Sequence, residues 1–447
     1  MGSKLVVGLD VGTTFCKAVV VDGDGVERAH GLRPTPWTTV PTGAEADPEE
    51  LAHAAIVAVR DALAGIEGEV AAVGVTGMAE TGVLLDGAGA PVAPAIAWHD
   101  RRGQGEAEAL ARELGSHRFA SATGLPPTAL CSLVKYRWLR DRHDGAHRGV
   151  RWLSVPEWVV RRLGGDDVAE LSLASRTGML DVVEGGWWSE ALEWGDAPAG
   201  LLPDPVPAGT PAGRAGDALP EVRGAVLTVA GHDHLAAAVG AGAVDDGDVL
   251  DDCGTSEALV RTLAAPLDRG AIQAAVVDGI TVGRHVVPGR MALLSGFGLS
   301  APLARTLRML GIGDDAARRR IDAEAAVLDA AELGVRVEGL LEETMSIRGV
   351  DDQVTAAHVW RAALEAAADA SADALRRMQA IAGPPRRVVM AGGEARSVAV
   401  RAVREARTAS LHWSPVREAA ARGAALLAAR AAGVPIASQP PVAAWSA

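Results

Sequence analysis

The hydrophobic pattern of the chain alternates between short runs of branched apolar residues and longer stretches in which apolar residues recur at helical spacing. Two such runs, residues 5–9 and 18–21, flank a short turn rich in Gly and Thr, and together they predict a β-hairpin. Further apolar runs at residues 70–76 and 225–230 have the length and branching of buried strands. The pattern therefore predicts an α/β protein, a class in which ligands bind at the carboxyl ends of the strands.

Helical patterns follow several of these strands. Asp47 precedes Pro48 and a pair of glutamates, which predicts a helix with Asp47 as its N-cap and Pro48 at its first position. Residues 354–382 form a long Ala-rich helical stretch that ends at a proline pair.

The turn of the first hairpin is a candidate anion site. Gly12, Thr13 and Thr14 offer backbone N–H groups and two hydroxyls to anionic oxygens, because glycine lets the backbone approach closely. Asp10 sets a carboxylate beside this turn, as expected where a divalent cation lies between an acid and a phosphate. The alternative for this stretch is a surface hairpin with a capping aspartate.

The same pattern recurs in the second half of the chain. An apolar run ends at Asp252 and is followed by Gly254, Thr255 and Ser256, which correspond in order to the aspartate, glycine and hydroxyl residues of the first hairpin. A repeat separated by about half the chain predicts two related domains, each of which brings one phosphate-binding hairpin to a shared cleft.

Composition narrows the class of protein. The chain has 447 residues, of which 49% are hydrophobic, and it contains no window of about 18 uncharged apolar residues, so no membrane partner is expected. The net charge of −14 argues against nucleic acid as a partner. Three scattered cysteines, and an N-terminus that leads straight into the first strand, predict a cytoplasmic chain without disulfides, a zinc site or a signal peptide. The sequence leaves open whether the chain forms a homodimer.

A series of motifs gives the chain a family resemblance. Glu80-Thr81 is followed, after an apolar strand, by Ile96-x-Trp98-x-Asp100-Arg101-Arg102. Further blocks follow in the order Gly124-Leu125-Pro126, Lys135-x-x-Trp138-Leu139, 152–165 and Ser172-x-Ala174-Ser175-x-Thr177-Gly178-Met179-Leu180-Asp181. Each block is weak alone, but the ordered set resembles the FGGY carbohydrate kinases, including their xylulokinase and glycerol kinase branches. The resemblance covers nearly the whole chain.

This resemblance implies an α/β fold of two ribonuclease H-like domains, of the actin, hexokinase and Hsp70 type, with a central cleft between them. Residues 1–240 would form the N-terminal sugar-binding domain, with the first phosphate hairpin and the catalytic aspartate. Residues 241–447 would form the C-terminal nucleotide-binding domain.

Asp233 lies where the apolar run 225–230 leads into an Ala-rich helix, and the resemblance places the catalytic aspartate of the family there. A carboxylate at such a junction is well placed to face a bound hydroxyl, so a general base is the favoured role. A structural cap, or a metal site with His232 and His234, are the alternatives. Because alternate residues of an extended segment point to opposite sides, the two histidines are expected to flank Asp233 rather than join it, and zinc would lack further ligands.

The resemblance also implies ATP and Mg²⁺ as cofactors. Asp10 would hold the magnesium ion, directly or through water. Lys17, where the family often has arginine, would lie near the transferred phosphate, unless it is a solvated strand charge. The Gly-x-Gly-x-x-Ala motif at residues 296–301 predicts a loop that leads into a helix near the phosphates, with a dinucleotide fingerprint as the alternative. The implied nucleotide-binding residues are Gly12, Thr13, Thr14, Lys17, Gly254, Thr255, Ser256, Gly298, Gly392, Gly393 and Ser397.

The implied acceptor site consists of Glu80, Trp98, Asp233 and His234. Compared with the glycerol kinase branch, Ala79 stands in place of an arginine, Leu130 in place of a tyrosine, and His234 in place of a glutamine. The loss of polar contacts and the gain of room favour a ketopentose or a larger polyol over glycerol. The alternative for Glu80 is a buried strand-end carboxylate that is satisfied by the backbone.

Three functions are compatible with the sequence. The favoured one is an ATP-dependent kinase that phosphorylates a hydroxyl of a sugar or polyol. The second is a catalytically silent module of the same superfamily that senses a nucleotide or sugar, but such a module has no use for a base such as Asp233. The third is a nicotinamide oxidoreductase that uses Gly296 and Gly298 and binds NAD but not ATP.

Overall fold

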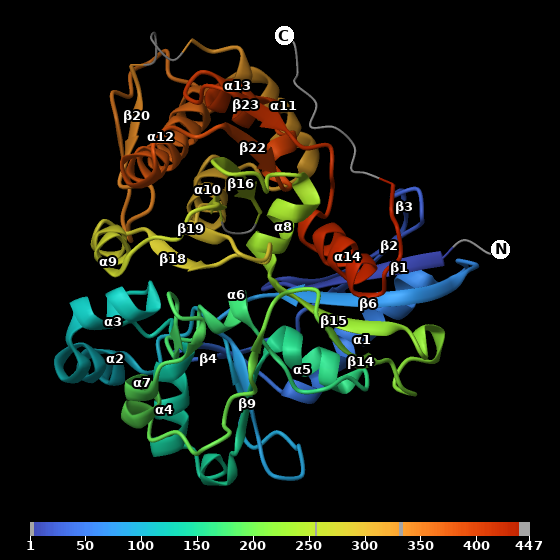
Figure 1. Cartoon of the computed structure of the whole chain (residues 1–447). Helices are drawn as coiled ribbons and strands as arrows, with labels where there is room; N and C mark the ends of the chain where they lie inside the picture. Colours follow the sequence, from blue (N-terminus) through green and yellow to red (C-terminus); the bar gives the residue numbers. More distant parts are fainter. Residues whose placement is uncertain (1–3, 255–256, 330–333, 438–447) are drawn as a thin grey trace. The chain divides into compact units, whose positions relative to one another are not determined.

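The computed structural model describes residues 4–254, 257–329 and 334–437 (Figure 1). Its contacts divide the chain into two compact units. The first unit comprises residues 1–244, 263–292 and 418–440, and the second comprises residues 245–262, 293–417 and 441–447. The predicted two-domain α/β fold is confirmed.

The first unit contains most of the strands and helices. Its strands are β1 (Lys4–Val11), β2 (Phe15–Val21), β3 (Glu27–Pro34), β4 (Thr38–Val40), β5 (Gly43–Ala46), β6 (Glu69–Gly77), β7 (Gly82–Leu85), β8 (Ala95–Ile96), β9 (Arg151–Ser154), β10 (Ala169–Glu170), β11 (Leu180–Asp181), β12 (Gly186–Trp187), β13 (Pro205–Val206), β14 (Pro211–Arg214), β15 (Val226–His232) and β18 (Thr281–Arg284). Its helices are α1 (Pro48–Leu63), α2 (Gln104–Leu110), α3 (Ser116–Thr123), α4 (Ser132–Arg142), α5 (Val155–Arg162), α6 (Leu171–Ala174), α7 (Ser189–Gly195), α8 (Asp233–Ala241), α9 (Arg269–Val277) and α14 (Ala419–Ala431), with short turns η1 (Ala111–Gly115), η2 (Ala146–Arg148) and η3 (Pro220–Val222).

The second unit is smaller. Its strands are β16 (Asp248–Cys253), β17 (Glu257–Leu263), β19 (Met291–Phe297), β20 (Arg336–Glu338), β21 (Ser346–Arg348), β22 (Arg387–Ala391) and β23 (Leu411–Trp413). Its helices are α10 (Ser300–Met309), α11 (Asp315–Ala326), α12 (Ala356–Ala382) and α13 (Val398–Glu405), with the short turn η5 (Glu394–Arg396).

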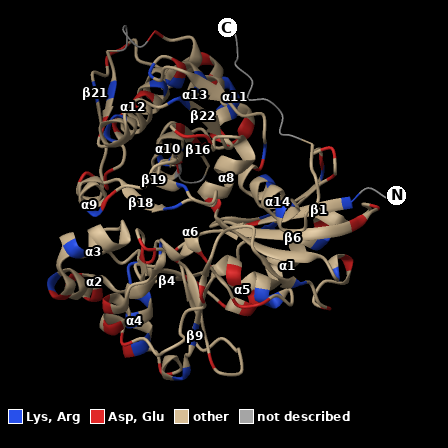
Figure 2. Cartoon of the chain, in the orientation of Figure 1, with Lys and Arg blue, Asp and Glu red and all other residues tan. Residues whose placement is uncertain are grey.

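A six-stranded sheet in the order β14-β15-β6-β1-β2-β3 organises the first unit. Strands β15, β6 and β1 are parallel, whereas β1 and β2 form the predicted antiparallel hairpin. The parallel strands are buried along nearly their whole length and mostly uncharged, while charged residues of both signs lie on the outer helices (Figure 2). Since parallel strands end at the same edge of a sheet, three chain segments are brought together there.

Helices cover both faces of this sheet (Figure 1). Helices α1 and α5 pack on one face, and helices α14 and α8 lie on the other. Helix α1 begins at Pro48 and is capped by the Asp47 side chain, which accepts a hydrogen bond from the Glu49 N–H at 2.7 Å, so the predicted helix start is confirmed. Within the described residues, none of the helices combines the length and apolar character required to span a bilayer.

Small residues allow α14 to lie unusually close to its neighbours. A Cβ atom added to Gly8 of β1 would lie 1.8 Å from the Ala421 carbonyl oxygen of α14. Between α8 and α14, a Cβ on Gly423 would lie 1.8 Å from the Ala236 carbonyl oxygen, and one on Gly240 would lie 1.9 Å from the Ala419 carbonyl oxygen. The last helix therefore packs against its neighbours by close backbone contact.

The second unit repeats the arrangement of the first around strands in the order β19-β17-β16-β22-β23 of a second sheet. Strands β16 and β17 form an antiparallel hairpin, and β22 pairs in parallel with β16, as β6 does with β1. Helix α12 is the predicted long helix, and its Trp360 is fully buried in the apolar core of this unit. The internal repeat seen in the sequence is therefore a repeat of topology.

We predict that Gly423→Ala lowers the free energy of unfolding by about 1–3 kcal/mol, because the new methyl group meets the backbone of α8. Urea denaturation of the purified chain measures this change. Gly105→Ala is the matched control, since a Cβ there meets no atom within 4 Å, and it should be neutral or stabilising by up to about 1 kcal/mol. Equal urea midpoints for the two variants would contradict the close contact between α8 and α14.

Candidate active site

Asp10 and Asp233 lie at the same edge of the first sheet. Asp10 is buried near the end of β1 and pairs across the sheet with Thr76 of β6, which in turn pairs with Gly231 of β15. The Thr76 hydroxyl donates a hydrogen bond to the Gly231 carbonyl oxygen at 2.6 Å. At the usual strand spacing, about 10 Å separates Asp10 from Gly231, two residues before Asp233. The pairing register of β1, β6 and β15 therefore places the carboxylates of Asp10 and Asp233 at the same edge of the sheet.

The turn after β1 is anchored through its carbonyl groups. The Thr35 hydroxyl donates to the Gly12 carbonyl oxygen at 2.8 Å, and the Trp37 indole N–H donates to the Thr13 carbonyl oxygen at 2.6 Å. The Gly12 N–H closes the hairpin by donating to the Phe15 carbonyl oxygen at 3.1 Å. Gly12 therefore contributes close approach to this turn rather than a hydrogen-bond donor of its own.

Lys17 lies on β2 directly opposite Asp10. Its ammonium group forms an ion pair with the Glu418 carboxylate at 3.0 Å, just before α14 begins, and its side chain is 35% exposed. The two alternatives from the sequence were a phosphate ligand and a solvated charge. The structure adds a third possibility, a partly exposed link between the first hairpin and α14.

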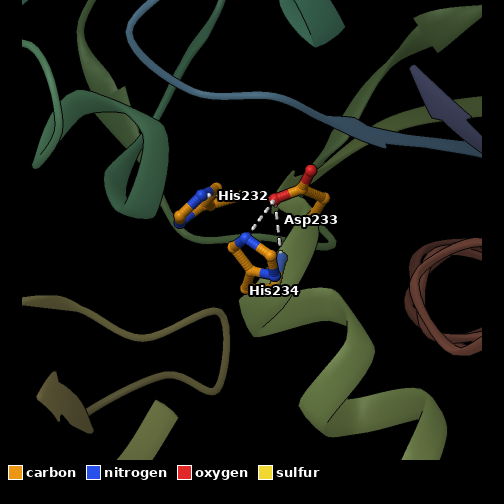
Figure 3. A group of neighbouring side chains, drawn as sticks. All are labelled: His232, Asp233 and His234. Carbon is orange, nitrogen blue, oxygen red and sulfur yellow. Dashed lines mark hydrogen bonds and ion pairs between the residues drawn. The ribbon is translucent and has the colours of Figure 1, made fainter. Parts of the chain in front are cut away.

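The segment from His232 to His234 differs from the prediction. Strand β15 ends at His232 and helix α8 begins at Asp233, so the alternation of an extended chain does not continue through this segment. His232 Nε2 lies 3.2 Å and His234 Nε2 4.0 Å from Asp233 Oδ1, and the His234 N–H donates to the same oxygen at 2.8 Å (Figure 3). The expectation that the histidines flank Asp233 without joining it is wrong, because the first turn of the helix folds them together.

The electrostatics of this group follow from burial and from the helix. Burial lowers the pKa of His232 to about 3, so its ring is neutral at physiological pH. The N-terminus of α8 favours negative charge on Asp233. The three side chains bring possible metal ligands within 4.8 Å of one another, but no fourth histidine, cysteine or carboxylate among the described residues joins them. A carboxylate beside the neutral His232 ring is a candidate general base.

Glu80 follows β6 and has left-handed backbone angles, with φ of 62°. The Ser132 hydroxyl donates to its carbonyl oxygen at 3.0 Å. The alternative for Glu80 was a carboxylate that is satisfied by the backbone. Its carboxylate instead pairs with a side chain, because Arg176 Nε donates to Glu80 Oε1 at 2.7 Å. The sequence reasoning missed Arg176, although this basic residue stands inside one of the motif blocks.

Trp98 connects the expected acceptor site with the first hairpin. Its indole N–H donates to the Thr13 hydroxyl at 2.9 Å, although the two residues are 85 positions apart. The His99 ring packs edge-on against the Trp98 ring, with centroids 5.2 Å apart. The residue expected to form a wall for the sugar and the turn expected to hold phosphates are therefore in direct contact.

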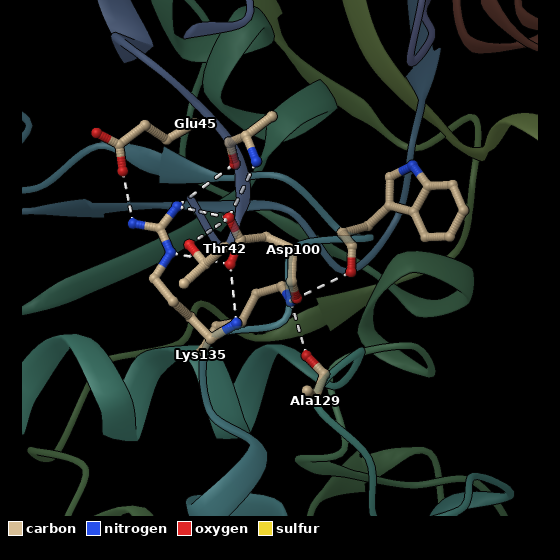
Figure 4. A network of polar contacts seen from close by, with 8 residues as sticks. Thr42, Glu45, Asp100, Ala129 and Lys135 are labelled. Carbon is tan, nitrogen blue, oxygen red and sulfur yellow. Dashed lines mark hydrogen bonds and ion pairs between the residues drawn. The ribbon is translucent and has the colours of Figure 1, made fainter. Parts of the chain in front are cut away.

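A buried lysine holds the Trp98 loop in place (Figure 4). Lys135 Nζ donates to the carbonyl oxygens of Ala129 at 2.7 Å, Trp98 at 3.2 Å and Asp100 at 3.5 Å. Burial lowers the pKa of this ammonium group to about 8. The Asp100 carboxylate in turn accepts hydrogen bonds from Arg102 and from the Ala44 N–H. Sequence reasoning quoted Lys135 only as a motif residue, but its contacts give it a positioning role.

Next to this network lies a pocket of about 350 Å³. Leu130, which stands in place of a tyrosine of the glycerol kinase branch, contributes to its wall and is 40% exposed. The other lining residues are His99, Asp100, Arg101, Gln104, Ala107, Glu108, Ala111, Pro127, Thr128 and Ala129. The structure therefore has room beside the loop that carries Trp98.

The second unit brings together some of the residues expected to bind the nucleotide. Gly392, at the end of β22, has φ of 97°, and a Cβ there would lie 2.4 Å from the Cys253 carbonyl oxygen at the end of β16. Gly254 follows on the second hairpin and lines a small pocket. Gly393 and Ser397 flank η5, and Ser397 caps α13 by accepting a hydrogen bond from the Val400 N–H at 3.3 Å.

Two further predictions concern this unit. Gly298 lies between β19 and α10, which confirms the predicted loop that leads into a helix. Thr255 and Ser256, predicted to bind phosphates, lie outside the described residues. Their roles remain predictions.

Known proteins share the sequence and the fold of this chain over most of its length. The model of the N-terminal domain of the FGGY family of carbohydrate kinases matches residues 5–240, and that of the C-terminal domain matches residues 317–432. A xylulose kinase of Streptomyces coelicolor is 30% identical over 95% of this chain and 87% of its own length. The crystal structure of the xylulose kinase from Rhodospirillum rubrum superposes with a TM-score of 0.83 at 25% identity, over 96% of this chain and 91% of that chain.

Some matches are more local. A glycerol kinase of Thermococcus kodakarensis is 35% identical over 45% of this chain, and a xylulose kinase of Streptomyces rubiginosus is 35% identical over 56%. In these two matches the chain spans 42% and 53% of the relative's length.

We predict that Lys135→Met lowers the free energy of unfolding by at least about 2 kcal/mol, because three carbonyl groups lose the buried ammonium group that is their common donor. Urea unfolding measures the loss. Lys4→Met, at the exposed start of β1, is the matched control and should leave the midpoint unchanged. A Lys135→Met variant as stable as this control would contradict the network.

A buried acid, Glu170, is linked through Ser172 to the end of strand β15, next to Asp233. Ser172 Oγ donates to Glu170 Oε2 at 2.6 Å and accepts a hydrogen bond from the His232 N–H at 3.0 Å. Burial raises the pKa of Glu170 to about 7. The folded chain therefore holds this proton more tightly than the unfolded chain, and the resulting stability is present at low pH and is lost as the pH rises through about 7.

We predict that Glu170→Gln reduces the loss of stability between pH 5 and pH 8, by up to about 3 kcal/mol, because the amide cannot ionise. Denaturant unfolding across this pH range tests the slope. Glu221→Gln, at an exposed position, should leave the slope of the wild-type chain unchanged. An unchanged slope in Glu170→Gln would mean that the buried acid does not titrate in this range.

Proposed function

The chain belongs to the FGGY family of carbohydrate kinases, and we propose that it transfers the γ-phosphate of ATP to a hydroxyl group of a sugar or polyol. The observation that carries this proposal is the edge of the first sheet, where Asp10 near the end of β1 and Asp233 just after β15 lie on either side of β6, and where Trp98 contacts Thr13. Such transfer needs positioned phosphates, a cation and an acceptor hydroxyl rather than covalent chemistry by the protein.

In this proposal Asp233 accepts the proton of the acceptor hydroxyl. The His234 N–H, and the nearby His232 ring, hold one carboxylate oxygen, Oδ1, and so orient the carboxylate. Glu80, Trp98 and His234 bind the acceptor. Thr13, Thr14 and Lys17 bind the phosphates. The other nucleotide-binding residues are Gly254, Thr255, Ser256, Gly298, Gly392, Gly393 and Ser397.

The buried carboxylate of Asp10 is the oxygen donor that Mg²⁺ prefers, and it lies beside the glycine of the phosphate turn, so the residues fit this ion. A Cβ on Gly12 would lie 3.6 Å from Asp10 Oδ2, so glycine keeps the approach to the carboxylate open. When bound, the cation would neutralise charge on the phosphates.

For the acceptor we propose a ketopentose or a larger polyol rather than glycerol. Ala79 is buried and offers no side-chain donor, and Leu130 lines a pocket of about 350 Å³. Relatives of the chain carry the names xylulose kinase, glycerol kinase and gluconokinase, so the family accommodates several acceptors. A larger acceptor makes use of the room that the smaller side chains leave.

We predict that wild-type protein releases ADP from ATP in a manner that depends on the acceptor, and that Asp233→Asn slows this release by about 10²–10⁴-fold. ATP affinity should stay near wild type, because the change removes only the base. A coupled assay over ketoses, aldoses and polyols, with calorimetry for ATP, measures both quantities. Asp217→Asn, at an exposed loop, is the control.

Comparable turnover in Asp233→Asn would remove this residue from the role of base. If no acceptor stimulates ADP release by the wild-type chain, the kinase proposal fails, and the nucleotide-sensing alternative takes its place.

A further inference from the structure

Glu80 and Arg176 form a nearly buried ion pair. Arg176 Nε donates to Glu80 Oε1 at 2.7 Å, and the two side chains are only 12% and 10% exposed, respectively. Burial of a single charge is costly, so each group makes the other tolerable at this position. The carboxylate expected to bind the acceptor is therefore part of a neutral unit.

Both partners are fixed by further contacts. Arg176 Nη1 donates to the Thr281 hydroxyl of β18 at 2.9 Å, and the Ser132 hydroxyl of α4 donates to the Glu80 carbonyl oxygen at 3.0 Å. Glu80 is also held at a φ of 62°, which a side chain such as glutamate adopts only when its surroundings impose it. The geometry of the pair is thus predetermined rather than adjustable.

One polar group on each side chain remains unused. Arg176 Nη2 and Glu80 Oε2 make no hydrogen bond to any residue in the described part of the chain. The pair therefore offers one donor and one acceptor beside each other, held by a rigid frame. This is the complement of two neighbouring oxygen atoms, one of which carries a hydrogen.

The pair lies on the same side of the domain as the proposed base. Arg176 comes two residues after α6, whose Ser172 accepts a hydrogen bond from the His232 N–H at 3.0 Å. Burial is the main cause of the low pKa of His232, and the charge of Arg176 acts in the same direction across the intervening space. The guanidinium is therefore close to the segment that carries Asp233.

We propose that Arg176 is a second acceptor-recognition residue that works as a unit with Glu80, an inference that rests on the proposed kinase function. Glu80 Oε2 accepts a hydrogen bond from one substrate hydroxyl, and Arg176 Nη2 donates to the oxygen on the adjacent carbon. The substrate class is a sugar or polyol with a hydroxyl next to a second hydroxyl or a carbonyl group. Ala79 supplies no donor, so Arg176 is the guanidinium that serves this carboxylate.

The test compares Arg176→Met, Arg176→Lys, Glu80→Gln and the double variant Arg176→Met/Glu80→Gln. We expect Arg176→Met to lower kcat/KM for the acceptor by about 10- to 100-fold, the loss typical of a hydrogen bond to a charged group, with KM for ATP unchanged. Arg176→Lys should recover only part of this loss, because an ammonium group cannot replace the planar fork. The double variant should lose no more than the worse single variant, because the residues act as one unit.

Acceptor analogues that lack one hydroxyl provide a readout that a structural role would not move. In the wild-type chain, removal of the recognised hydroxyl should weaken binding, whereas in Arg176→Met the same removal should matter much less. Arg161→Met is the matched control, since Arg161 pairs with Asp167 within the same unit, and it should preserve the acceptor preference. Additive losses in the double variant, or a uniform loss over all analogues, would overturn the proposal.

Acceptor binding in the absence of ATP, measured by calorimetry, separates the two proposals. If the wild-type chain binds an acceptor that Arg176→Met does not bind, but neither turns it over, the kinase function fails and the role of Arg176 stands. If both bind the acceptor equally well, the role of Arg176 is wrong whatever the turnover. If the wild-type chain neither binds nor phosphorylates any acceptor, both proposals are overturned.

Discussion

The parallel register of β1, β6 and β15 is the constraint on which the rest of the first domain depends. Because the three strands run in the same direction and pair residue by residue, their carboxyl ends meet at one edge, where Asp10 and Asp233 lie. Both faces of these strands are buried, and α14 approaches β1 so closely that only glycine fits at Gly8. A slip of one residue would bring a larger side chain against the backbone of α14. Packing of the core thus decides where the chemistry can occur.

Helices α14 and α8, on one face of the sheet, fit against these strands because glycines lie at the contacts. Helix α14 lies against β1 with a glycine at the contact, and against α8 through Gly423 and Gly240. Any side chain at these positions would hold the backbones apart and move α8, whose first residue is Asp233. The position of the proposed base therefore depends on glycines at the other end of the same helix and in α14, far along the chain.

Several buried polar groups of the first unit are linked in connected networks. Lys135 joins two loops through three carbonyl groups, and Ser172 links Glu170 to the backbone of His232. Arg176 joins Glu80 to Thr281 in the same way. Because a buried donor or acceptor without a partner is costly, such networks hold loops almost as firmly as secondary structure does. These contacts fix the loops that carry Glu80 and Trp98 of the candidate acceptor site.

The sequence by itself determined the elements that depend on local pattern. These are both hairpins, the start of α1 at Pro48, the long helix α12 and the junction of strand and helix at Asp233, because apolar spacing and capping residues act over a few positions. Only the tertiary structure decided which side chains meet: Trp98 with Thr13 across 85 positions, and Arg176 with Glu80 across 96. It also drew His232 and His234 to Asp233, where the pattern of an extended chain predicted otherwise. The physical reason is that local rules fix the path of the backbone, whereas the partner of a buried polar group is chosen by whichever distant segment the packing brings within hydrogen-bond distance.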